Sequence, residues 1–160
     1  MGGDYKMEFI PIDIDKHREV IIPFRRDSFI VSFGTEEGLG DENTYLEWIQ
    51  QRSTIYPNGF VLVVEEGVPI GQLELNVKEY EGKEIGYVNL YYLVPEKRGV
   101  GLGSLLHAYA IQFFKDHGVK EYHLRVSPTN EQAIAFYKKN GMQKLKVEMD
   151  GKVIRMAGKV

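Results

Sequence analysis

The sequence contains no cysteine, and this absence excludes disulfide bonds, thiolate metal sites and a cysteine nucleophile. No apolar run approaches the roughly 20 residues that a membrane-spanning helix needs, and the N-terminus lacks the charged and apolar regions of a signal peptide. The net charge of −3 gives no positive potential that would attract the phosphate backbone of a nucleic acid. We therefore expect a cytoplasmic protein that binds neither a membrane nor nucleic acid.

The length and composition are those of one folded domain. The chain has 160 residues, of which 43% are hydrophobic and 27% are charged, as in an ordinary globular protein. The opening Met1-Gly2-Gly3 resembles an added linker, and Met7 is a candidate natural start. We expect a single domain over residues 1–160, with residues 1–6 disordered or not native.

The first third of the chain combines one strand with helices. Residues 8–14 alternate apolar and polar around a proline, which is typical of an edge strand. Residues 17–33 have apolar side chains at helical spacing, but Pro23 interrupts them, so we expect a broken helix followed by a loop. Capping side chains from residue 41 onward predict a second helix that ends near Ser53.

The remaining sequence predicts a mixed sheet with two further helices. Three strands joined by tight turns form an antiparallel meander, and the third is apolar at nearly every position, as in a central strand covered on both faces. Later, a strand–helix–strand unit predicts a parallel pair made by a right-handed crossover. The expected elements are strands at 60–65, 70–77, 85–94 and 121–127, helices from 102 to a cap at Gly118 and over 130–139, and two strands flanking the turn at 150–151.

A glycine-rich loop, Arg98-Gly99-Val100-Gly101-Leu102-Gly103, follows the central strand and opens the next helix. Unpaired backbone N–H groups and the helix dipole therefore point at one spot, where an anion is stabilised. The glycines remove Cβ atoms that would hold a pyrophosphate away, and Lys97 and Arg98 add positive charge. A tight turn with solvated basic residues is the alternative interpretation.

Two familiar classes of anion loop do not fit this segment. A P-loop ends in Gly-Lys-Ser/Thr, whereas this loop continues as Gly103-Ser104-Leu105. A dinucleotide fingerprint needs a glycine at the sixth position, which is Ser104 counting from Gly99 and Leu106 counting from Gly101. The antiparallel meander upstream is also wrong for a dinucleotide-binding fold.

The arrangement Arg98-x-x-Gly101-x-Gly103 resembles the Gln/Arg-x-x-Gly-x-Gly/Ala motif of the GNAT superfamily of N-acetyltransferases. A second segment, Asn130-x-x-Ala133-x-x-Phe136-Tyr137-x-x-x-Gly141, matches as well, and the resemblance runs from residue 60 to 141. It implies an α/β (α+β) fold: a mixed, mostly antiparallel sheet with a splayed central parallel pair and about four flanking helices. It further implies acceptor-side elements at 7–59 and an acetyl-CoA-binding core at 60–160.

The resemblance also implies roles for individual residues. Backbone groups of the central strand's end would pair with pantetheine, the loop would hold the diphosphate, and Asn130 would contact the cofactor beyond the next strand. Tyr137 would lie near the thioester sulfur as the general acid. The implied cofactor-binding residues are Leu93, Val94, Arg98, Gly99, Val100, Gly101, Leu102, Gly103, Ser104, Asn130, Ala133, Phe136 and Tyr137.

Acyl transfer to an amine needs a base, because a lysine-like amine with a pKa of about 10.4 is almost fully protonated at neutral pH. Glu74 and Glu84 are the candidate bases, with a water chain or a solvated strand position as the alternative for each. A backbone N–H at a bulge around residues 91–93 would stabilise the oxyanion. Core packing is the alternative for Tyr137, and a helix N-cap is the alternative for Asn130.

The sequence thus predicts an acetyl-CoA-dependent N-acetyltransferase that modifies a primary amine on a small molecule or a protein. A binding module that senses acyl-CoA without transfer chemistry is the alternative, and an interaction domain without CoA affinity is a third interpretation. His107 and His123 have no metal-ligand spacing, so no metal is expected. Dimers are frequent in the family, which makes a homodimer a further expectation by analogy.

Overall fold

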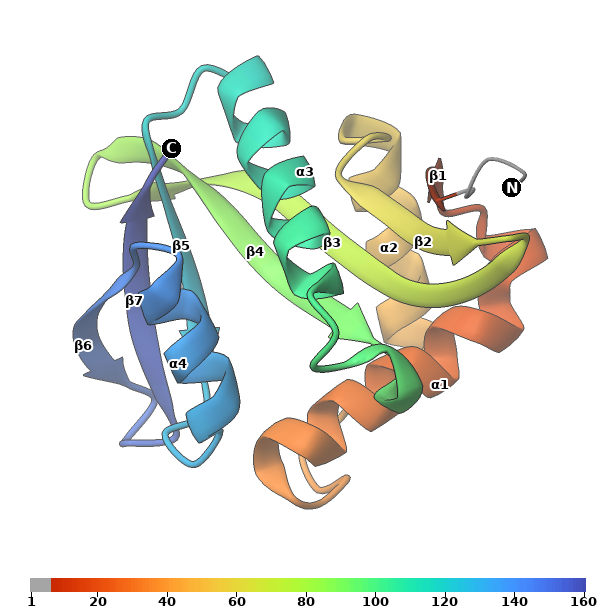
Figure 1. Cartoon of the computed structure of the whole chain (residues 1–160), viewed down its shortest axis with the longest axis horizontal. Coiled ribbons are helices and arrows are strands. Elements are labelled where there is room, and N and C mark those ends of the chain that lie inside the picture. The colour runs from red at the N-terminus through yellow and green to blue at the C-terminus, as the bar shows by residue number, and fades with distance from the viewer. Residues whose placement is uncertain (1–6) are drawn as a thin grey trace.

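The computed structural model describes residues 7–160 as one sheet flanked by helices on both faces (Figure 1). The expectations for residues 1–6 lie outside the described residues. None of the helices between residues 7 and 160 is long and apolar enough to cross a bilayer. The elements in chain order are β1 (Met7–Pro11), α1 (Ile14–Phe33), α2 (Glu42–Ile55), β2 (Phe60–Glu65), β3 (Val68–Tyr80), β4 (Lys83–Leu93), a short 3-10 turn η1 (Pro95–Lys97), α3 (Leu102–Asp116), β5 (Glu121–Val126), α4 (Glu131–Lys139), β6 (Gln143–Glu148) and β7 (Val153–Lys159).

The strands form a mixed sheet in the order β1-β2-β3-β4-β5-β7-β6. Its neighbouring strands are antiparallel except β4 and β5, which are parallel. The mixed sheet, the edge strand β1 and the central place of β4 are confirmed. The meander strands β3 and β4 extend further towards their shared turn than the sequence predicted, because their hydrogen-bonded pairing continues to Tyr80 and Lys83.

The parallel pair separates soon after it forms. β4 and β5 pair only at Gly86–Tyr122, Tyr87–His123 and Val88–Leu124, although β4 continues to Leu93. On its other side, β4 shifts register against β3, since Leu75 faces Val88 while Glu74 faces Leu90. Asn89 is therefore the extra residue of a β-bulge, which bends the strand. The bulge expected at residues 91–93 lies at Asn89 instead, and the predicted splay begins there.

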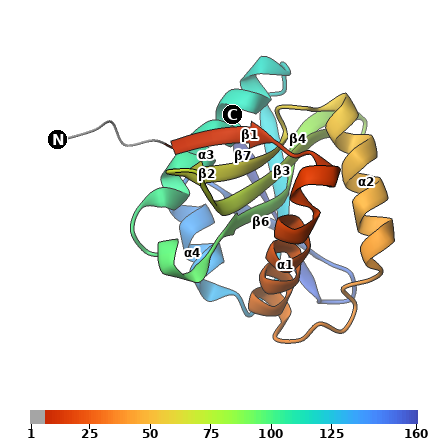
Figure 2. The same ribbon diagram turned by 90° about the vertical axis from the view of Figure 1, so that its right-hand side faces the viewer.

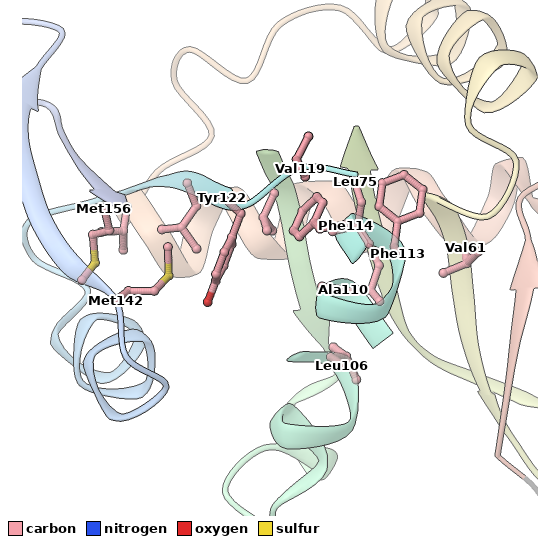
Figure 3. Packing of buried hydrophobic residues seen from close by; sticks show 14 of the residues in the cluster. Val61, Leu75, Leu106, Ala110, Phe113, Phe114, Val119, Tyr122, Met142 and Met156 are labelled. Carbon is pink, nitrogen blue, oxygen red and sulfur yellow. The ribbon is translucent and has the colours of Figure 1, made fainter. Parts of the chain in front are cut away.

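Helices cover the two faces of the sheet as separate layers, with α3 and α4 on one side and α1 and α2 on the other (Figure 2). The larger core lies under α3, where Phe113 and Phe114 pack among residues such as Leu75 (Figure 3). Gly86 allows this close packing, because a Cβ there would lie 2.4 Å from the ring of Phe114. Packing on α3 thus holds β4 where its pairing with β5 begins.

The helix α1 is continuous through Pro23, so the predicted break is wrong. Proline removes the N–H that would bond to the carbonyl of Glu19 one turn earlier. Both residues are exposed, so solvent can reach that carbonyl while the opposite face of α1 stays packed. The second helix is confirmed, and the side chain of Asp41 caps it by accepting a hydrogen bond from the Thr44 N–H at 3.0 Å.

Candidate functional site

A cavity of about 590 Å³ occupies the gap between β4 and β5. Tyr91 and Leu93 line it from the α3 side of the sheet, whereas Tyr45 and Glu74 line it from the α2 side. Because side chains of both faces line one cavity, it runs through the sheet. The elements contributing to its wall are α1, α2, β3, β4, β5, α4 and the segments around Gly40, Arg98 and Ser127.

Glu74 is a buried carboxylate in the wall of this cavity, with only 4% of its surface exposed. The Tyr45 hydroxyl donates a hydrogen bond to its Oε2 at 2.5 Å, and Gln72 Nε2 donates to the same oxygen at 2.8 Å. Burial raises the pKa of Glu74 from 4.5 to about 7, outweighing these two bonds and the nearby Arg25. A carboxyl group with this pKa exchanges protons readily at neutral pH.

Glu84, the other candidate base, lies at the start of β4, far from the end of that strand that borders the gap. It is exposed and pairs with Glu79 near the β3–β4 turn, before the segment in which β4 contacts β5. It does not line the cavity. The structure therefore places Glu74, and not Glu84, beside the space where chemistry can occur.

Tyr137 of α4 lines the same cavity and is half-buried. Burial raises the pKa of its phenol to about 12, with a further contribution from Tyr122, so the hydroxyl keeps its proton at neutral pH. Its ring lies 6.2 Å from that of Tyr91, centroid to centroid. The Tyr91 hydroxyl is buried without a hydrogen-bond partner among residues 7–160, which leaves it available to a group entering the gap.

The glycine-rich loop leads directly into α3. Gly101 is the N-cap residue with φ of 89°, and within the described chain no side chain caps this helix, so its first N–H groups remain available. A Cβ on Gly99 or Gly101 would meet no atom within 4 Å, which leaves open space over the loop. Gly103 differs, because a Cβ there would lie 3.0 Å from Phe136, so this glycine makes room for α4.

Arg98 joins the loop to both β4 and α1. Its Nε donates to the carbonyl of Leu93 at 2.8 Å, and a terminal nitrogen lies 2.9 Å from Asp27 Oδ2. The Tyr92 hydroxyl donates to the same Asp27 oxygen at 2.5 Å. The side chain of Arg98 thus supports the loop and the end of β4 while lining the cavity.

At the end of β4, the backbone groups of Leu93 and Val94 differ in whether they face the gap. Val94 uses both backbone groups inside the protein: its N–H donates to Ile70 O at 2.9 Å, and its carbonyl accepts from Lys97 N at 3.0 Å. Since successive residues of a strand direct these groups to opposite sides, Leu93 faces the gap. Leu93 lines the cavity and Val94 does not.

The α4 segment brings only part of its predicted set to the cavity. Asn130 and Ala133 line it, and Asn130 also caps α4, accepting a hydrogen bond from the Ala133 N–H at 3.3 Å. Phe136 does not line it and packs against Gly103 instead. The remaining loop residues, Val100, Leu102 and Ser104, lie at the start of α3, with Val100 65% exposed.

Sequence reasoning missed Tyr45, Arg25 and Arg125 as cavity residues. Tyr45 donates a hydrogen bond to Glu74 from α2, and Arg25 of α1 lies over the Tyr45 ring, so their positions depend on how these helices pack on the sheet. The only available signal was the aromatic and basic character of these positions. Residues 7–160 contain no group of His, Asp and Glu side chains that could hold a metal ion.

The family model described as "Acetyltransferase (GNAT) family" matches residues 23–142. A protein named as an uncharacterized N-acetyltransferase from Methanocaldococcus jannaschii is 28% identical over 106 residues, which are 64% of this chain and 46% of that protein. The mycothiol acetyltransferase of Paenarthrobacter aurescens is 36% identical over 88 residues, 53% of this chain and 27% of that protein. The matches thus span less than half of the length of these two relatives.

Solved structures share the fold over nearly the whole chain. The PaiA N-acetyltransferase from Thermoplasma acidophilum, solved with coenzyme A, has a TM-score of 0.73 and 23% identity, covering 97% of this chain and 99% of that one. Naa20 from Chaetomium thermophilum, solved with a bisubstrate analogue, has a TM-score of 0.75 and 17% identity, covering 97% and 86%. The predicted fold class is confirmed.

Proposed function

Since this chain belongs to the acetyltransferase (GNAT) family, we propose that it transfers an acetyl group from acetyl-CoA to a primary amine. The observation that carries the proposal is the cavity through the sheet, which has Glu74 in one wall and Tyr137 in another. A proton acceptor and a proton donor thus line a space whose walls belong to both faces of the sheet, which suits two substrates that approach from opposite sides.

Acetyl-CoA would lie in the gap with its diphosphate at the start of α3. The orphan N–H groups there, together with the open space over Gly99 and Gly101, suit an anion. The backbone of Leu93 would pair with the pantetheine arm, because β5 no longer occupies that edge of β4. Coenzyme A bound to the PaiA protein of the same fold supports this class of cofactor.

Glu74 would accept the proton of the acceptor amine, whose nitrogen then attacks the thioester carbonyl carbon. The carbon–sulfur bond breaks as the amide forms, Tyr137 donates its proton to the departing thiolate, and the amide nitrogen releases its second proton to water. The products are the N-acetylated amine and coenzyme A. Proton exchange with solvent returns Glu74 and Tyr137 to their starting states.

The pKa of Glu74 makes this role energetically reasonable. A pKa of about 7 in place of 4.5 makes the carboxylate a stronger base by about 3 kcal/mol per proton. The carboxylate is still weaker than an amine of pKa about 10, so a rapid attack must follow each proton transfer. The buried cavity favours this coupling because it holds the base next to the reacting nitrogen.

Thiol release from acetyl-CoA in the presence of an amine panel tests the activity. The decisive comparison is Glu74→Gln against Glu84→Gln, since only the first carboxylate lines the cavity. We expect Glu74→Gln to lower kcat by roughly 10²–10⁴-fold and Glu84→Gln to leave it unchanged. Binding of acetyl-CoA without thiol release for any amine would instead identify a non-catalytic sensor.

A further inference from the structure

A second cavity, of about 190 Å³, lies on the same face of the sheet as Glu74 and is lined by strand residues alone. On β3, Glu74 and Lys78 share this face because alternate residues point the same way, while Leu75 packs on the opposite side. Three cations line the cavity: Lys78, Arg125 and Arg155. It is therefore a basic hollow on the acceptor side of the proposed active site.

Arg125 connects the two cavities, since its side chain lines both of them. It directly follows Leu124, the last residue of β5 that pairs with β4. Arg125 therefore lies where the gap opens. Glu74 and the basic cavity lie on the same face of the sheet, with Arg125 in the lining of both cavities.

The cationic side chains are held in place by the residues behind them. Arg155 is 7% exposed and lies 3.0 Å from Glu148 Oε1 and 2.9 Å from His123 Nδ1. Arg125 Nε donates to the same Glu148 oxygen at 2.9 Å. Among the described residues, the hydrogen bonds of Arg125 use only Nε, so its two terminal nitrogens can donate to a ligand.

The charges of this cavity are not balanced. Three cations face two carboxylates, since Glu79 lines the cavity and the arginines share Glu148. Burial lowers the pKa of Lys78, and Arg125 and Arg155 lower it further. An anion bound here would reduce this repulsion and would accept the unused donors.

We propose that the basic cavity binds a carboxylate of the acceptor while the acceptor amine lies at Glu74, which makes the substrates amines that also carry an anionic group. This inference rests on the proposed transferase function. Lys78 lies four positions after Glu74 on one strand, so the two subsites are about 13 Å apart.

A matched series of acceptors tests the charge and the length together. Linear amino-carboxylates are compared with their terminal amides and with diamines of the same chain length. We expect kcat/KM to be highest for the carboxylate and lowest for the diamine, with an optimum at intermediate length. Equal kcat/KM for the three end groups at every length would overturn the proposal.

A second set of acceptors tests whether the carboxylate belongs to an acidic side chain near a protein terminus or to a free small molecule. These acceptors are the C-terminal amides of Ala-Asp-Gly-Gly and Ala-Asn-Gly-Gly. A preference for the aspartate peptide over both its asparagine partner and the linear amino-carboxylates would identify a peptide source for the carboxylate. The opposite ranking, with amino-carboxylates preferred, would identify a small molecule.

Variants of the cavity residues then test whether the preference for a carboxylate arises in the basic cavity. Arg125→Gln should raise KM for the amino-carboxylate by about tenfold to a hundredfold, because a charge-assisted hydrogen bond is lost, and should affect the amide far less. Lys78→Glu should shift the preference towards the diamine. Lys152→Gln, in the exposed β6–β7 turn, is the matched control and should leave the ranking unchanged. Equal effects of Arg125→Gln on all three acceptors would refute the subsite.

Binding measured without turnover separates this inference from the proposed function. Saturation-transfer NMR reports contact of the amino-carboxylate with the protein in the presence of coenzyme A. If no amine releases thiol, the transferase function fails, whereas the subsite is still judged by this signal. A signal lost in Arg125→Gln supports the carboxylate site, and an unchanged signal overturns it.

Discussion

Replacing Glu74 by glutamine should stabilise the protein and remove its activity together. The folded protein holds the Glu74 proton up to a pKa of about 7, whereas the unfolded chain releases it near 4.5. Between these pH values the folded state binds more protons, so the free energy of unfolding falls as pH rises and levels off above pH 7. The full loss is about 3 kcal/mol at high pH.

Glutamine has the same shape, cannot ionise, and keeps an oxygen that accepts the hydrogen bond from Tyr45. The variant should therefore match the wild type near pH 4.5 and exceed its stability by up to about 3 kcal/mol at pH 8. Urea unfolding at pH 5, 6, 7 and 8 measures this difference, with the exposed Glu84→Gln as the control. A stability difference that does not change with pH would refute the burial argument.

The same carboxyl group should control the pH dependence of catalysis. Because Glu74 acts as a base only when ionised, kcat/KM for the wild type should rise with pH through a midpoint near 7. Glu74→Gln should lower the rate and remove this step, while Glu84→Gln should keep it. A step retained in Glu74→Gln would assign the titration to another group.

Three further substitutions test the cofactor side of the site and its scaffold. Tyr137→Phe should lower kcat by roughly 10²-fold with little change in the acetyl-CoA Kd, because the phenol acts on the leaving thiolate; titration calorimetry and thiol release separate these effects. Gly101→Glu should abolish the thermal shift produced by acetyl-CoA, since φ of 89° strains the loop and the added charge repels a diphosphate; an undiminished shift would place the cofactor elsewhere. Gly86→Ala should destabilise the fold by about 1–3 kcal/mol in urea unfolding, because its Cβ would lie 2.4 Å from Phe114.

Local sequence signals predicted most of the secondary structure. Tight turns marked the limits of the meander strands, and Asp41 marked the start of α2 by supplying its cap. The glycines before α3 predicted open space beside the loop, and a Cβ on Gly99 or Gly101 would meet no atom within 4 Å. These predictions succeeded because turns and caps depend on neighbouring residues.

Errors arose where packing overrides local preference. Pro23 predicts a break, but its lost hydrogen bond falls on the exposed side of a helix whose other side is packed, so α1 continues. Likewise, the bulge lies at Asn89 because the register of β4 against β3 sets its position. The identity of the residue alone does not reveal that register.

The sequence by itself determined the order of the elements, the position of the glycine-rich loop before α3 and a short set of candidate residues, since each depends on residues close together in the chain. The tertiary structure alone placed Glu74, and not Glu84, in the wall of the cavity, although the two carboxylates lie on neighbouring strands. Burial under α1 and α2 raises the pKa of Glu74 to about 7, while Glu84 stays exposed. The structure likewise joined Arg125 to both cavities. Desolvation and cavity shape depend on segments far apart in sequence, so only the folded chain determines them.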